Sequence, residues 1–231
     1  MRIRITMAAT AAAGLLSLSA VPATAAAGDA PAPDGAGQAC TDVKLSGSLP
    51  APPAGMAVRQ QVTIGADCKP QLGPARLVAA VGADTGGGAG AAAAGAKAAG
   101  TRQLKSWSEM YDCCNIRMTG LYTTSTWGTD GNRVTTAATE ARQEWNREPW
   151  DAGWSLESSS KNADCLTDCA VSHNEAHAEF SYKGVFDTSG DWYANKHHSY
   201  VDLNADGTAS CSFDVELKHS FIGWNLQRGC S

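Results

Sequence analysis

The chain has 231 residues and a formal net charge of −5 at pH 7, from 18 basic and 23 acidic residues. Its first 27 residues contain Arg2 and Arg4 but no acidic residue, so the rest carries 16 basic and 23 acidic residues. This acidic balance does not favour binding to nucleic acid or anionic lipid. We therefore expect no nucleic-acid partner and no stable membrane insertion.

Residues 1–27 have the plan of a secretory signal peptide. Arg2 and Arg4 precede an uncharged, Ala-rich stretch, and small residues offer cleavage after Ala25 or Ala27. The alternative is a membrane anchor, but the apolar part falls short of the roughly 20 strongly apolar residues that a spanning helix needs. The sequence predicts a secreted, extracellular protein in which residues 28–39, rich in Pro, Gly and Ala, are disordered.

The cysteines all lie beyond this signal, and an even number of them in an exported chain predicts a disulfide framework. The candidates are Cys40, Cys68, Cys113, Cys114, Cys165, Cys169, Cys211 and Cys230. Zinc binding is the alternative, but the spacings do not combine a C-x2-C pair with a matching histidine pair. We expect no metal and no cofactor.

A linker divides the chain over residues 82–104. Within it, fourteen of the fifteen residues from Gly86 to Gly100 are Gly or Ala. A helix is disfavoured because each glycine in a helix interior costs about 1 kcal/mol relative to alanine. A flexible coil between two folded segments is predicted instead.

Residues 40–81, before the linker, are predicted to form a small β-hairpin arm clipped by one disulfide. Val58, Val62 and Ile64 fit a strand, and Cys40 and Cys68 bracket the segment. A two-strand hairpin buries too little surface to be stable alone. The arm is therefore expected either to pack on the C-terminal domain or to offer its edge to another chain.

Residues 105–231 hold six cysteines and all seven tryptophans and are predicted to form a mostly β, disulfide-stapled antiparallel β-sandwich. Between Cys211 and Phe221, apolar residues alternate with polar ones, which is the pattern of a half-buried strand. Gly- and Asp-containing turns are expected at residues 129–132 and 204–207. The exception is Thr136 to Trp145, where alanines suggest a short helix.

The pairing of the six cysteines in this domain is left open by the sequence, which allows fifteen arrangements. Cys165 and Cys169 are close enough to pair with each other. Adjacent Cys113 and Cys114 should point to opposite faces of an extended segment and seek different partners, so that with Cys211 and Cys230 they could tie the domain's beginning to its end.

The segment from His173 to Glu179 superficially resembles a metal motif. Its order is H-x-E-x-H, whereas zinc proteases use H-E-x-x-H on a helix. On a strand, His173, Glu175, His177 and Glu179 would line one exposed face, and solvation of that face is the preferred interpretation over metal binding.

Residues 202–207 match the first half of an EF-hand calcium loop. The twelfth position should be a bidentate glutamate but is Phe213. A hairpin turn, which Asp and Asn also favour, is the preferred interpretation.

Acid–base catalysis is supported only by unplaced side chains. Asp151 with Glu157, or Asp187 with Asp191, could act on a glycosidic bond if the fold set their separation. No G-x-S-x-G elbow for a catalytic serine occurs in the chain. His219, on the apolar face of its strand, is expected to be a hydrogen-bonded core histidine.

The tryptophans and tyrosines could serve the core or a surface, because flat aromatic faces also stack on sugars or anchor protein interfaces. Most are expected in the core. Those near Gly and Asp turn residues are the surface candidates: Trp150, Trp154, Trp192 and Tyr193.

Two strings in the C-terminal half, Trp107 to Cys114 and Phe221 to Cys230, resemble small secreted actinobacterial proteins without assigned activity. The resemblance extends from Trp107 to Cys230 and implies a Cys/Trp framework, with no catalytic residue to carry over. In general plan, a β body with an N-terminal extension that enters a partner, the chain is also similar to adaptor subunits of secreted antibacterial toxin particles.

These observations predict a non-enzymatic secreted binding or adaptor protein. Its arm would add the Val58 to Ile64 edge to the sheet of a secreted protein partner. The alternatives are a carbohydrate- or cell-wall-binding protein that holds a polysaccharide through exposed aromatic residues, and a secreted hydrolase with unplaced carboxylates.

Overall fold

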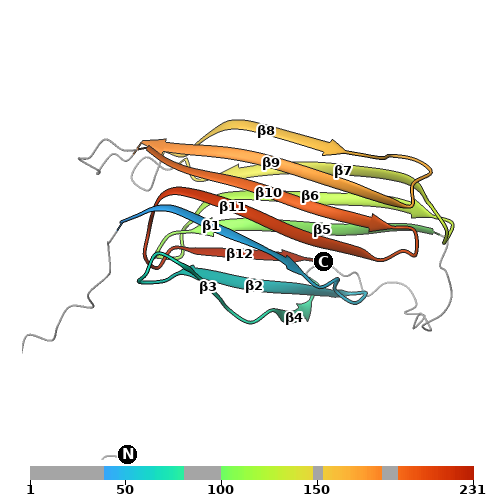
Figure 1. Ribbon diagram of the computed structural model, residues 1–231, viewed down its shortest axis with the longest axis horizontal. Helices are drawn as coiled ribbons and strands as arrows, with labels where there is room; N and C mark the ends of the chain where they lie inside the picture. The colour runs from blue at the N-terminus through green and yellow to red at the C-terminus, as the bar shows by residue number, and fades with distance from the viewer. Residues whose placement is uncertain (1–38, 81–99, 148–152, 184–191) are drawn as a thin grey trace, which may run out of the picture. The chain divides into compact units, whose positions relative to one another are not determined.

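The computed structural model describes residues 39–80, 100–147, 153–183 and 192–231. These residues form twelve strands, arranged as two antiparallel sheets that pack face to face (Figure 1). The predicted β-sandwich is thereby confirmed. No helix long and apolar enough to cross a membrane occurs in the described ranges.

The first sheet, sheet A, has five strands. In spatial order these are β1 (Ala39–Leu49), β11 (Ala209–Phe221), β10 (Trp192–Asn204), β9 (Val171–Lys183) and β8 (Ser155–Ala163). The predicted turn at residues 204–207 joins β10 to β11, where Gly207 has φ 85° and donates its N–H to the Asn204 carbonyl at 3.0 Å.

The second sheet, sheet B, has seven strands. Six of them lie in the order β3 (Pro70–Leu72), β2 (Met56–Ile64), β12 (Asn225–Cys230), β5 (Gly100–Tyr111), β6 (Arg117–Thr129) and β7 (Val134–Trp145). The seventh, β4 (Arg76–Ala79), pairs with the first half of β2, next to β3, which pairs with its second half.

The core lies between the sheets and follows the alternation of the sequence. In β11, the side chains of Phe213, Val215 and Leu217 are buried as predicted, and Leu121 of β6 and Leu226 of β12 are buried in the opposing sheet. Burying side chains of this size contributes about 1.5–3 kcal/mol each. The two inner faces therefore supply the main hydrophobic stabilisation.

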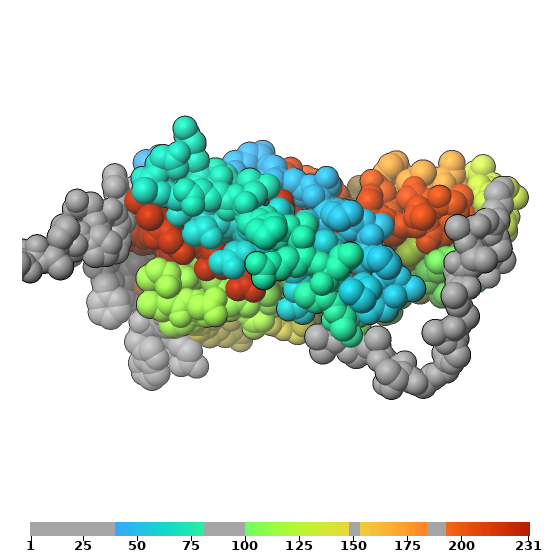
Figure 2. Space-filling model, turned by 90° about the horizontal axis from the view of Figure 1, so that it is seen from below, coloured from blue at the N-terminus to red at the C-terminus, as the bar shows by residue number. Residues whose placement is uncertain are grey.

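The predicted hairpin arm is wrong. β1 pairs with β11 in sheet A, whereas β2 pairs with β12 in sheet B. The space-filling view shows this blue-to-teal part of the chain lying directly against the red and green segments (Figure 2). The physical reason is burial, because the apolar faces of β1 and β2 each complete one layer of the sandwich.

The short helix expected from Thr136 to Trp145 is also wrong, because these residues belong to β7. Thr139 faces inward, where its hydroxyl bonds to Ser125 at 2.8 Å and to Asn174 at 3.1 Å. β-Branched threonines and pairing along the whole of β6 outweigh the helix propensity of the alanines.

Two disulfides fasten the sheets together near opposite ends. Cys40–Cys68 joins β1 to the turn after β2, and Cys211–Cys230 joins β11 to β12. Cys40 pairs with Ser220 and Leu49 with Cys211, so the two bridges lie about 30 Å apart along the strands. Several disulfides are typical of proteins from oxidising, extracellular compartments.

The expected role of Cys113 and Cys114 is therefore wrong, because Cys211 and Cys230 bond to each other. Cys113 and Cys114 lie exposed in the turn between β5 and β6, with 3.6 Å between their sulfur atoms.

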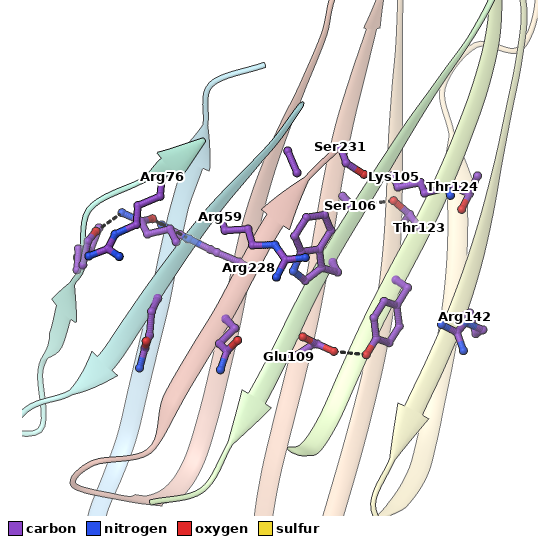
Figure 3. Close-up of a pocket in the computed structure, with 18 of the residues that line it drawn as sticks. Arg59, Arg76, Lys105, Ser106, Glu109, Thr123, Thr124, Arg142, Arg228 and Ser231 are labelled. Atoms are coloured by element: carbon purple, nitrogen blue, oxygen red, sulfur yellow. Dashed lines mark hydrogen bonds between the residues drawn. The ribbon is translucent and has the colours of Figure 1, made fainter. Parts of the chain in front are cut away.

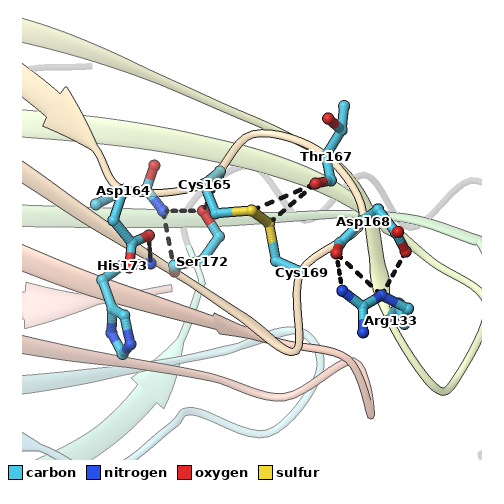
Figure 4. The surroundings of a disulfide bond; sticks show 9 residues. Arg133, Asp164, Cys165, Thr167, Asp168, Cys169, Ser172 and His173 are labelled. Atoms are coloured by element: carbon cyan, nitrogen blue, oxygen red, sulfur yellow. Dashed lines mark hydrogen bonds and ion pairs between the residues drawn. A yellow bond between two sulfur atoms is a disulfide. The ribbon is translucent and has the colours of Figure 1, made fainter.

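The predicted Cys165–Cys169 bridge closes the loop between β8 and β9 (Figure 4). This loop is held to the start of β7, where the backbones of Val134 and Cys169 exchange hydrogen bonds of 2.7 and 3.0 Å. Arg133 also donates to the Asp168 carbonyl at 2.9 Å. The loop thus makes a third connection between the sheets.

The core histidine is His197, not His219. His197 is fully buried, and its two ring nitrogens lie 2.9 Å from the Ser108 hydroxyl and 3.0 Å from the Thr119 hydroxyl. Burial first, then the charges of His198 and His177, lowers the pKa of His197 to about 3. His219 is half-buried with a left-handed φ of 53°, which interrupts the alternation and turns Ser220 inward.

Candidate functional site

The outer face of sheet B carries an open groove of about 1110 Å³ (Figure 3). Its floor comes from β2, β12, β5, β6 and β7, and residues 71–76 of the β3–β4 segment form one side. The lining combines two aromatic rings with polar and charged side chains.

Alternation in β5 decides which side chains reach the groove. Ser106 and Ser108 point into the sandwich, where their hydroxyls bond to Thr123 and His197. Lys105, Trp107 and Glu109 therefore point outward.

Strand register aligns one row of groove residues across five strands. Arg59 of β2 pairs with Gly229 of β12, Gly229 with Trp107 of β5, Trp107 with Tyr122 of β6, and Tyr122 with Arg142 of β7. With a strand spacing of about 4.8 Å, the row is about 19 Å long.

The missing side chain of Gly229 makes room for the indole of Trp107. A Cβ at Gly229 would collide with Cζ2 and Cη2 of the Trp107 ring. The indole therefore lies over the backbone of β12 and broadens the floor of the groove.

Cations flank the aromatic pair. The Arg59 guanidinium lies 5.4 Å from the Trp107 ring centroid, and that of Arg142 lies 4.7 Å from the Tyr122 ring. Such cation–π contacts contribute about 0.5–1 kcal/mol each at exposed sites. They fix the two aromatic side chains in place.

Glu109, two residues after Trp107 on the outward face of β5, holds the side chain of Tyr122 in place. The Tyr122 hydroxyl donates a short hydrogen bond to Glu109, and Arg117 pairs with the same carboxylate at 3.3 Å. Burial, followed by the Glu109 hydrogen bond and charge, raises the pKa of Tyr122. The phenol stays neutral, so the ring remains a rigid, hydrogen-bonded surface that can stack on a ligand.

Most of the predicted binding residues are absent from this groove. Trp154 and Tyr193 are core residues with 3% and 5% exposure, and Val58, Val62 and Ile64 are each 1% exposed. Trp150 lies outside the described residues, as does the side chain of Trp192. The predicted strand addition through residues 58–64 is contradicted too, because β2 is paired along both edges.

The histidine-rich strand β9 does present an outward face. His173 bonds to Asp202 at 2.7 Å, which raises the pKa of His173, and Glu175 lies 3.1 Å from Nδ1 of His198. Within the described ranges, no group of three or more His, Cys, Asp or Glu side chains is placed to hold a metal ion.

The remaining motifs have local structural roles where they are described. Asp206 accepts hydrogen bonds from the backbone and hydroxyl of Thr208 at 2.9 and 2.7 Å, as expected of a turn residue. Glu157 accepts bonds from Ser155 and Ser181. Asp151, Asp187 and Asp191 lie outside the described residues.

Sequence reasoning missed the pair Trp107–Tyr122. The strict alternation from Lys105 to Glu109 shows that Trp107 shares a face with two charged residues, a signal for an outward position. No sequence signal places Tyr122, Gly229 and Arg59 beside it, because that depends on register. Comparison of the chain with protein-family models, curated proteins and solved structures found no match in any of the three.

Proposed function

We propose that this protein is a secreted, non-enzymatic glycan-binding protein whose sugar-binding surface is the groove on sheet B. The observation that carries the proposal is the cross-strand pair of Trp107 and Tyr122 on the floor of an open groove. Aromatic faces provide apolar area for the C–H faces of sugar rings at low entropic cost.

The polar side chains of the groove supply hydrogen-bond donors and acceptors for the hydroxyl groups of a sugar. Gln61, Gln71 and Gln227 provide amide donors and acceptors at one side, and Thr124 provides a hydroxyl at the other. Hydroxyl groups of a bound sugar can be paired by such side chains, which orient the ring on the aromatic floor.

Binding to a glycan array, together with retention on insoluble peptidoglycan and chitin, tests the proposal. The wild-type protein should bind. Trp107→Ala should lose about tenfold or more in affinity if a sugar ring gains from the indole what a stacked nucleobase gains from an aromatic side chain, about 1–3 kcal/mol. Tyr200→Ala is the matched control, because Tyr200 lies on sheet A.

Trp107→Phe separates stacking from folding, because it keeps an aromatic face and should retain part of the affinity. Thermal unfolding of each variant shows that the fold is intact. Failure of the wild-type protein to bind any glycan, or equal binding by Trp107→Ala and wild type, would refute the proposed function.

A further inference from the structure

The groove is cationic in an otherwise acidic protein. Its lining includes five cationic side chains and two carboxylate side chains, whereas the whole chain has a net charge of −5. The cations are Arg59, Arg76, Lys105, Arg142 and Arg228. All but the buried Arg228 are exposed.

Both carboxylate side chains of the groove already interact with groups of the protein. Glu109 accepts the Tyr122 hydroxyl and pairs with Arg117, and Glu140 pairs with Lys161 at 2.7 Å. Their charge is thus largely compensated within the protein.

Three of the exposed cations are not compensated in this way. Among the described residues, no carboxylate lies within ion-pair distance of Arg59, Arg76 or Lys105. Outside the groove, Lys44 pairs with Glu216 and Lys196 with Glu179, whereas Arg147 and Lys218 have no ion-pair partner among the described residues. What distinguishes the groove is that three such cations line one surface.

These cations surround the aromatic floor. Arg59 lies over Trp107, and Lys105 precedes Trp107 by two residues on the same face of β5. In Figure 3, Arg76 and Arg142 lie toward opposite sides of the groove, with Arg59 and Lys105 between them. An anionic group on a sugar stacked at Trp107 would thus meet guanidinium or ammonium donors on either side.

We propose that the groove binds an acidic glycan, with sugar rings stacked on Trp107 and Tyr122 and anionic substituents held by Arg59, Arg76 and Lys105. This inference rests on the proposed function and names its ligand class. Guanidinium forks bind carboxylate and phosphate groups in the same bidentate manner, so both substituents share the recognising chemistry.

The experiment uses a glycan array of matched pairs, with each uronic acid glycan beside its methyl ester and each phosphorylated glycan beside its unphosphorylated form. The wild-type protein should bind the acidic member of a pair about tenfold more tightly at low salt. This preference should shrink in 1 M NaCl, where the Debye length is about 3 Å. The pair that discriminates tells whether the substituent is carboxylate or phosphate.

Variants that remove positive charge test whether the groove causes the preference for acidic glycans. The double variant Arg59→Gln with Lys105→Gln should lose most of the preference, whereas Lys44→Gln, on sheet A, should keep it. Equal binding of acidic and neutral members by wild type would overturn this inference but leave the proposed function standing. An unchanged preference in the double variant would overturn it as well, and absence of any bound glycan would overturn both.

Discussion

Arg228 of β12 donates a hydrogen bond to the carbonyl oxygen of Gly47 in β1, 3.2 Å away, and so connects the two sheets through the core. Its guanidinium is buried, and its other bonds go to the side-chain oxygen of Gln60 at 2.7 and 3.1 Å. Burial lowers the pKa of Arg228, and the oxygens of Gln60 and Gly47 that accept its hydrogen bonds are uncharged. The connection therefore depends on neutral acceptors.

We predict that removing the buried cation destabilises the protein less than removing the side chain that accepts its hydrogen bonds. Arg228→Met should change the free energy of unfolding by less than about 1.5 kcal/mol, because it removes a costly buried charge and retains volume. Gln60→Ala should destabilise by about 1–3 kcal/mol, because donors of a buried charge lose their partner. Urea unfolding of both variants measures the difference, and a larger loss for Arg228→Met would contradict the explanation.

Gly229→Ala should weaken both the fold and the groove. The added methyl group would collide with the Trp107 ring and approach the Val58 carbonyl, so we expect a loss of about 1–3 kcal/mol, as for other overpacked sites. Displacement of the indole should also reduce glycan affinity. Gly153→Ala is the control, since a Cβ there has no neighbour within 4 Å. Equal melting temperatures for the two variants would show that Trp107 does not need Gly229.

His197 should make the protein less stable in acid. Its pKa is about 3 in the folded state, below the value of about 6.5 expected when unfolded, so the unfolded chain binds the extra proton between these values. Stability from this group is therefore complete above pH 6.5 and is lost as the pH falls, by about 2 kcal/mol from pH 7.5 to pH 5. Urea unfolding at both pH values measures this loss.

His197→Asn should reduce that acid sensitivity, whatever its effect at neutral pH. His173→Gln is the control, because Asp202 raises the pKa of His173 and its contribution has the opposite sign. Stabilisation by His173 is present at low pH and disappears as the pH rises through its folded pKa. The control variant should therefore keep the full acid loss, and an equally flat profile in both variants would argue against burial of His197 as the cause.

Removal of the Cys211–Cys230 bridge should destabilise the protein more than removal of the Cys165–Cys169 bridge. Replacing Cys211 and Cys230 by alanine opens a loop of 19 residues, whereas replacing Cys165 and Cys169 opens one of 4. The chain-entropy model gives about 3 kcal/mol for the longer loop and about 2 kcal/mol for the shorter one. Chemical unfolding of the two double variants measures both losses, and the reverse order would indicate that strain or packing outweighs the loop term.

The sequence by itself determined several of the strands, two turns and two of the three disulfides, because these are local. Alternation in Cys211–Phe221 predicts which side chains face the core, and Cys165 and Cys169 can pair because four residues separate them. Cys40 and Cys68 were also paired correctly, since they bracket one folded segment. The hairpin failed because local patterns do not say which sheet a strand will join. The helix at residues 136–145 and the end of the linker at residues 100–104 were predicted wrongly, because pairing with β6 makes both segments strands.

Only the tertiary structure decided the groove and the identity of the core histidine. Trp107, Tyr122, Arg59 and Gly229 come from four strands, and they meet because antiparallel register places one residue of each in a single row. A register shift of one residue would turn every one of these side chains to the other face. His197 became the buried histidine because Ser108 and Thr119, on the opposite sheet, complete its hydrogen bonds, a long-range condition that no local spacing records.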